Sequence, residues 1–423
     1  MRNFILSTGL ISLLITSVQA QELSLKQAWE YALKHNPTMA SVGYDEAIAA
    51  KNLDIAKAAY RPQVHLNMDY RKIDGDRAGF YQGMMPEKKG SFNAKINQKL
   101  FSLDTNTQIE KAKISQTLAN LHLDSTRMDL AYAIGTSAVD IAYTQVALGI
   151  YKERAKRISA YLNMANDKYK AGTIDIGDVY RWESELSKIK STIQEANNTI
   201  VTNKSMLKNY LGMSQSEVID ISLTQGDIEA FTNINKDDVI ANPKIEMLKE
   251  NIKSDGMEAN NIERSFYVPE FSLYGSTEEM LYKGGDGSQL PSSQNWNTYT
   301  VGVEVNFPLY EGGAKQAKKE ALRVKQLQTQ SDIQSFEDEL SKEQESAFSS
   351  INAYQESFKL DSASADKAMK YLLTKHQQYQ EGATDITPLL DAEEYATLAE
   401  LKVEQTKYLI MRYKLMLAYA LNK

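Results

Sequence analysis

The sequence predicts an α+β membrane protein built from a duplicated unit of helix, β-hairpin and long helices. Three observations predict this class. Short motifs recur at a nearly constant offset, the hydrophobic period changes from helical to alternating in each copy, and long stretches rich in Ala, Lys, Gln and Glu contain no proline.

The chain repeats itself with an offset that stays between 206 and 210 positions. Asn36-Pro37 recurs as Asn242-Pro243, and Tyr169-Lys170-Ala171-Gly172 recurs as Tyr379-Gln380-Glu381-Gly382. Because chance matches would not keep so steady an offset along the whole length, the sequence is a tandem duplication.

The duplication divides the chain into two repeats. Residues 21–212 form the first repeat and residues 239–423 the second, and the polar residues 213–238 are expected to be an irregular link. The predicted hairpins occupy about 63–102 and about 269–309.

Residues 1–20 have the features of a secretory signal peptide. A positive charge at Arg2 precedes an apolar run from Phe4 to Ile15, and small residues lead up to Ala20. The alternative is a membrane anchor, but the run is short and lacks a second charged flank. We therefore expect cleavage after Ala20 and export.

The composition excludes several classes of function. The chain has no cysteine, which excludes disulfides, thiolate metal sites and cysteine nucleophiles. A net charge of −7 argues against nucleic acid as a partner. The four histidines lack metal-ligand spacing, and no P-loop, nucleophile elbow or Rossmann motif is present. We expect no catalytic residues, metal or cofactor, and therefore no enzyme.

Each repeat contains two stretches in which apolar and polar residues alternate. In the first, Val64, Leu66 and Met68 alternate with His65, Asn67 and Asp69. Such alternation predicts strands whose apolar face meets either a protein core or membrane lipid. Mean hydropathy is −0.45, and no apolar helical span follows the signal, so a membrane crossing would need these strands.

Four strands per chain cannot close a barrel, and lipid does not tolerate open strand edges. The chain is therefore expected to oligomerise. Three copies would supply twelve strands, and two copies remain possible on these grounds alone.

Long helices are predicted on either side of a glycine turn in each repeat. Residues 104–170 and 176–211 meet at Gly172, and residues 311–380 and 386–421 meet at Gly382. Glycine at these positions is typical of a left-handed helix C-cap. The alternative to a membrane protein is a periplasmic coiled-coil scaffold or adaptor without membrane insertion.

The order of elements, the Asn-Pro pairs, the Tyr-x-Pro before each hairpin and the two Tyr-x-x-Gly turns resemble the TolC-like outer-membrane efflux proteins. The resemblance implies a homotrimer in the outer membrane. It implies a twelve-stranded barrel that continues into a twelve-helix periplasmic tunnel, without catalysis. It also implies a passive exit duct for efflux or type I secretion, which works with a periplasmic adaptor and an inner-membrane transporter.

The resemblance also suggests a gate at the second helix turn. Asp391 matches a constricting acidic residue of the family, Tyr379 an aromatic latch, and Asp178 a residue that latches neighbouring protomers. Thr384 occupies the position of a basic partner and Pro388 that of a second acidic residue, so the sequence departs from the family there. The alternatives are a solvated carboxylate at a helix start for Asp391 and simple packing for Tyr379. Gly172 and Gly382 match the tips that contact the adaptor, or are simply two C-caps.

Overall fold

The computed structural model describes residues 21–73, 88–223, 227, 242–284 and 298–421. The predicted signal peptide, both hairpin tips and most of the predicted link lie outside the described residues. The chain forms two compact units: one combines residues up to 41 with 126–242 and 339–423, and the other combines 42–125 with 243–338.

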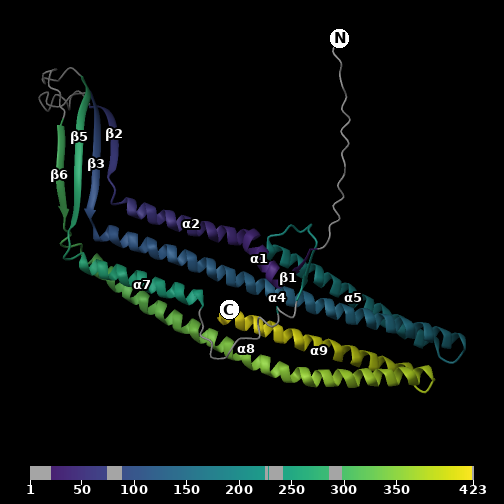
Figure 1. The fold of residues 1–423 in the computed structure, drawn as a ribbon. Helices are drawn as coiled ribbons and strands as arrows, with labels where there is room; N and C mark the ends of the chain where they lie inside the picture. Colours follow the sequence, from purple (N-terminus) through teal and green to yellow (C-terminus); the bar gives the residue numbers. More distant parts are fainter. Residues whose placement is uncertain (1–20, 74–87, 224–226, 228–241, 285–297, 422–423) are drawn as a thin grey trace, which may run out of the picture. The chain divides into compact units, whose positions relative to one another are not determined.

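The second unit contains a four-stranded antiparallel sheet in the order β2-β3-β5-β6 (Figure 1). The strands are β2 (Gln63–Lys72), β3 (Lys88–Phe101), β5 (Glu270–Gly284) and β6 (Thr298–Asn306). They lie where alternation predicts strands. The hairpins of the two repeats join through β3 and β5, so each repeat contributes half of one sheet.

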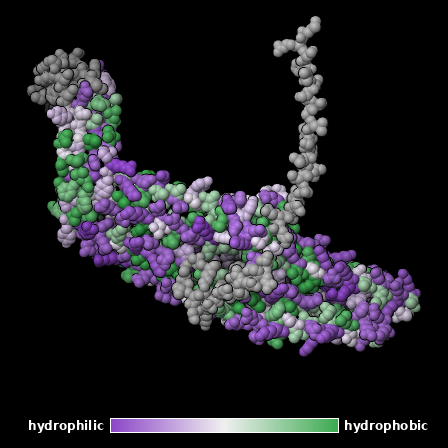
Figure 2. All heavy atoms as spheres, viewed as in Figure 1, coloured by the Kyte–Doolittle hydropathy of each residue, from purple (hydrophilic) through white to green (hydrophobic). Residues whose placement is uncertain are grey.

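The apolar face of this sheet is exposed. Val64 is 70%, Met68 69%, Tyr299 87% and Val301 79% accessible. Figure 2 shows hydrophobic residues gathered over the strands, in contrast to the more hydrophilic helices. A soluble sheet would pack this face on a core, and the described part of the chain supplies no such cover. Exposure of this kind marks a surface for lipid or for another protein.

Two very long helices each return through a shorter one. The four are α4 (Leu103–Lys170), α5 (Ile176–Leu211), α8 (Ala314–Gln380) and α9 (Ile386–Leu421). At a rise of 1.5 Å per residue, α4 and α8 are each about 100 Å long. Helix α8 begins later than predicted, because Gly312 and Gly313 have φ of 62° and 84°, outside the right-handed helical region.

Among the described residues, α4 is the one helix long and apolar enough to cross a membrane, and its most apolar 18-residue window has a mean hydropathy of 1.2. Packing accounts for part of this apolar character. Val139 of α4 belongs to a buried cluster with Met411 and Leu415 of α9. The composition of α4 is therefore that of a helix with an apolar packing face.

The first unit also contains a small sheet that corrects the predicted link. β1 (Gln21–Ser24) pairs in parallel with β4 (Ile219–Ser222), inside the segment expected to be irregular. Ile219 and Ile221 are buried, but two apolar residues are too few for alternation to reveal a strand.

The shorter helices near the start of each repeat begin at a capping side chain or at a proline. Ser24 and Gln27 form a capping box at the start of α1 (Leu25–His35). Asn36 accepts from the Thr38 and Met39 amides, 2.7 and 3.1 Å away, at the start of α2 (Pro37–Ala58). In the second repeat, α7 (Pro243–Arg264) likewise begins at the proline of Asn242-Pro243.

Candidate functional site

The two helix turns of the first unit have the same backbone geometry. The Gly172 amide donates to the Tyr169 carbonyl and the Thr173 amide to the Lys168 carbonyl, at 2.9 and 3.0 Å. Gly382 and Ala383 repeat both bonds. This pattern is the Schellman motif, which needs a left-handed residue at the glycine. The φ angles of Gly172 and Gly382, 73° and 72°, meet that need.

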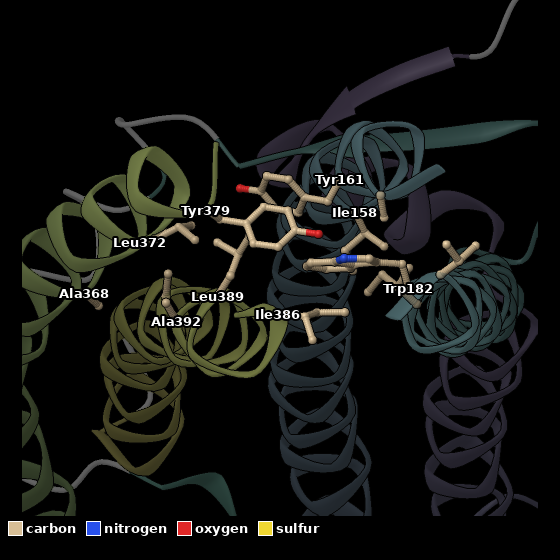
Figure 3. Close-up of a cluster of buried hydrophobic side chains, with 13 residues drawn as sticks. Ile158, Tyr161, Trp182, Ala368, Leu372, Tyr379, Ile386, Leu389 and Ala392 are labelled. Atoms are coloured by element: carbon tan, nitrogen blue, oxygen red, sulfur yellow. The ribbon is translucent and has the colours of Figure 1, made fainter. Parts of the chain in front are cut away.

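Beside these turns lies a buried cluster formed by α4, α5, α8 and α9 (Figure 3). The rings of Tyr161, Trp182 and Tyr379 gather at its centre. The centroid of Trp182 lies 5.0 Å from that of Tyr161 and 6.4 Å from that of Tyr379. Because Trp182 is fully buried, this contact joins the tip of the first repeat to that of the second.

Tyr379, the predicted aromatic latch, is 2% exposed. Lys168 of the first repeat donates to the Tyr379 carbonyl, and its Nζ lies 4.2 Å from the centroid of the ring. Burial, together with the nearby negative charge of Asp178, raises the pKa of Tyr379. Val179, the residue next to Asp178, belongs to the same buried cluster as Tyr379, so these two predicted site residues lie near each other.

The other predicted gate residues lie on the turn and on the first turns of α9. Asp391 is exposed, Thr384 and Pro388 are half-buried, and Gly172 and Gly382 are exposed. Arg181 of α5 donates to Thr387 Oγ1 at 2.9 Å, beside Pro388. A hydrogen bond between the repeats is therefore present at the tips, although Thr384 cannot supply the basic group of the family pattern.

Sequence reasoning missed a buried ion pair farther along the same helices. Arg157 of α4 contacts Glu393 of α9, which has no exposed surface. Burial and the Glu393 charge raise the pKa of Tyr161, and burial raises that of Glu400. The sequence does contain one signal for this ion pair. Glu393 lies four residues after Leu389 and three before Ala396, which places a charged residue on the apolar face of α9.

The described residues contain no group of three or more His, Cys, Asp or Glu side chains that could hold a metal. Taken together, the molecule has an exposed amphipathic sheet and two long helical hairpins whose tips are tied together in a buried cluster. An amphipathic sheet with an exposed apolar face, together with long helical hairpins, is the combination expected of an outer-membrane channel protein.

Residues 28–213 and 253–423 match the family described as outer membrane efflux protein. Because this match covers most of the chain, the chain belongs to that family. The TolC-like resemblance and the outer-membrane location predicted from the sequence are thereby confirmed.

Individual relatives agree with this assignment. TolC of Vibrio cholerae is 19% identical over 296 residues, which cover 69% of this chain and 66% of that protein. The proteases secretion protein PrtF of Dickeya chrysanthemi is 21% identical over 345 residues, which cover 78% and 73%. The structure of the outer membrane protein VceC of Vibrio cholerae has a TM-score of 0.76 at 15% identity, covering 94% of this chain and 95% of that one.

The family places this chain among outer-membrane efflux or secretion channels. Its members are channels and secretion proteins rather than enzymes.

Proposed function

We propose that three copies of this chain form a passive exit duct through the outer membrane. Each copy would contribute β2, β3, β5 and β6 to a twelve-stranded barrel and four long helices to a twelve-helix periplasmic tunnel. The observation that carries this proposal is a single four-stranded sheet whose apolar face is exposed and whose outer strands are β2 and β6.

Open edges explain why one chain does not suffice. The outer sides of β2 and β6 present backbone N–H and C=O groups without a strand partner among the described residues, and such groups are costly in lipid. Pairing β6 of one copy with β2 of the next would satisfy both edges. Twelve strands lie within the range of known outer-membrane barrels, whereas four are too few to enclose a lumen.

The helix tips would form the periplasmic entrance. Asp391 is exposed on α9, as a carboxylate that faces a lumen must be, and three such groups would form a ring that attracts cations. Contacts among Lys168, Tyr379, Arg181 and Thr387 hold the two tips of one copy together. In this proposal the exposed turns at Gly172 and Gly382 receive a periplasmic adaptor, and an inner-membrane transporter supplies the energy, since the sequence contains no nucleotide-binding motif.

A matched pair of variants tests the membrane assignment. Val301 and Thr300 are neighbours on β6 that point to opposite faces. Val301→Lys places a charge on the proposed lipid face, which costs about 2–4 kcal/mol near the bilayer midplane, so the yield in outer-membrane fractions should fall. Thr300→Lys places the charge toward the lumen, and the yield should stay near that of the wild type.

The assembly itself is measured on detergent-extracted protein. Native mass spectrometry should give a mass of three chains, and planar bilayers should show discrete conductance steps. A protein that is released from cells in soluble form without detergent would exclude the duct and favour the scaffold alternative. A particle of two chains would leave the membrane assignment intact but overturn the trimer.

A further inference from the structure

The polar face of the sheet carries a row of side chains without a carboxylate. In the strand register, Lys95 of β3 lies opposite His65 on one side and Ser276 on the other, and Ser276 lies opposite Thr300. Residues directly opposite each other point to the same face. This row, His65–Lys95–Ser276–Thr300, therefore crosses all four strands with Lys95 as its one full charge.

One carboxylate elsewhere on this face is paired with a lysine, and two others accept from hydroxyl groups and keep their charge. Glu278 forms an ion pair with Lys89 at 2.7 Å, and Asp69 accepts from Ser91 Oγ at 2.5 Å. Glu270 accepts from Ser102 Oγ at 2.6 Å.

The charged carboxylates without a lysine partner among the described strands are distant from the row. Asp69 is four residues from His65 along β2, Glu270 is six residues from Ser276 along β5, and Glu304 is four residues from Thr300 along β6. At about 3.4 Å per residue these separations are roughly 14 Å or more along the strands, with further strand spacings to β3. Such separations exceed a Debye length of about 10 Å at 0.1 M salt, so these carboxylates do little to neutralise Lys95.

The adjoining row carries an aromatic residue, Tyr274, on the same face. Tyr274 is opposite Asn97 and Gly302, two positions along from Ser276 and Lys95 on the same face. A Cβ at Gly302 would come within 2.6 Å of the Tyr274 hydroxyl, so this ring lies flat across the glycine. The ring therefore extends toward β6, on the side of β5 away from Lys95.

We propose that the row His65–Lys95–Ser276–Thr300 is an anion-attracting section of the channel wall, with Lys95 as the residue that sets ion preference there. The inference rests on the proposed function, which turns the polar face toward a lumen. Three copies would place three lysines at one level. This section would favour small anions and anionic groups of a cargo, in series with the carboxylates proposed for the periplasmic entrance.

The absence of cysteine allows a direct test. Lys95→Cys would be measured in planar bilayers at about 0.1 M KCl, where screening is modest. The background would be Asp391→Ala, which removes the entrance carboxylate in series. The anion-to-cation permeability ratio should fall by at least about twofold when the lysine charge is lost. A cationic thiol reagent should restore the ratio, and an anionic one should lower it further.

Lys88→Cys is the matched control, since it lies on the same strand but on the opposite face, opposite Lys72. Thiol reagents there should leave the ratio unchanged. Provided that channels still form, two outcomes would overturn the inference. One is a permeability ratio that changes when the thiol at position 88 is modified, and the other is a ratio that does not change when the thiol at position 95 is modified. Absence of any conductance in the wild type would instead contradict the proposed function itself.

If Lys95→Cys does not assemble, Lys95→Gln and Lys95→Arg replace it. The ratio should fall in the first and be kept in the second. Equal ratios in these two variants would likewise refute the role of the charge.

Discussion

Arg157 of α4 and Glu393 of α9 form a two-pronged ion pair, with Nε 2.7 Å from Oε1 and Nη2 3.2 Å from Oε2. The Glu393 side chain is completely buried, whereas that of Arg157 is 28% exposed. A buried carboxylate that loses its partner stays desolvated without compensation. The pair therefore fixes the register between one helix of the first repeat and one of the second.

Arg157→Leu should destabilise the protein by about 3–5 kcal/mol, because it leaves the Glu393 charge buried and unpaired. Thermal unfolding followed by the helical circular-dichroism signal in detergent measures the loss. The double variant with Glu393→Leu should recover most of it. Lys156→Leu is the control: its side chain is 71% exposed, and its effect should stay within about 0.5 kcal/mol. Equal losses at 156 and 157 would contradict this account.

Glu400→Gln should stabilise the protein at neutral pH. In the folded protein, burial is the largest effect on the pKa of Glu400 and raises it. The positive charge of Arg157 lowers this pKa, and the negative charge of Glu393 raises it. The folded state thus binds this proton more tightly than the unfolded state does. The ionised side chain costs stability above the folded pKa, and the cost vanishes below the unfolded pKa of about 4.3.

Melting temperatures of Glu400→Gln and wild type should accordingly differ at pH 7 and converge near pH 4. Glu394→Gln, an exposed neighbour on α9, should show no such dependence. A difference for Glu400→Gln that persisted unchanged at pH 4 would mean that the effect has another origin than the charge.

Gly382→Ala should cost about 1–2 kcal/mol, because its φ of 72° is unfavourable for a residue with a Cβ. Gly149 is the matched control: it lies within α4, and a Cβ there would meet nothing within 4 Å. Gly149→Ala should therefore stabilise by up to about 1 kcal/mol through helix propensity. Unfolding in denaturant measures the change in the free energy of unfolding for both variants. If both variants stabilise the protein, or both destabilise it, the left-handed turn at Gly382 would be refuted.

Asp391→Ala should raise single-channel conductance or weaken block by multivalent cations in planar bilayers, since it removes the proposed ring of carboxylates. Glu394→Ala, also exposed on α9, is the control and should leave both quantities unchanged. Unchanged conductance and block in Asp391→Ala would remove this residue from the gate.

Local patterns predicted most of the fold. Alternation located β2, β3 and β6, and the glycine turns located the ends of α4 and α8. These features depend on residues close together in sequence. The β1–β4 pair and the Arg157–Glu393 pair join residues about two hundred positions apart, and no local pattern encodes such a pairing. At the helix tips, the family resemblance suggested Tyr379 as an aromatic latch. Its contact with Lys168 could not be predicted, because it depends on how the helices of the two repeats pack.

The pairing of β3 with β5 has a consequence for how the protein is made. Lys95 and Ser276 are register partners, yet 181 positions separate them in the chain. During synthesis the first hairpin is complete long before its partner strand exists, and contacts of such long range form slowly. Until β5 has been translated and exported, the edge of β3 that β5 later covers has unpaired backbone groups. The first hairpin is therefore exposed to edge-to-edge pairing with other chains until β5 arrives.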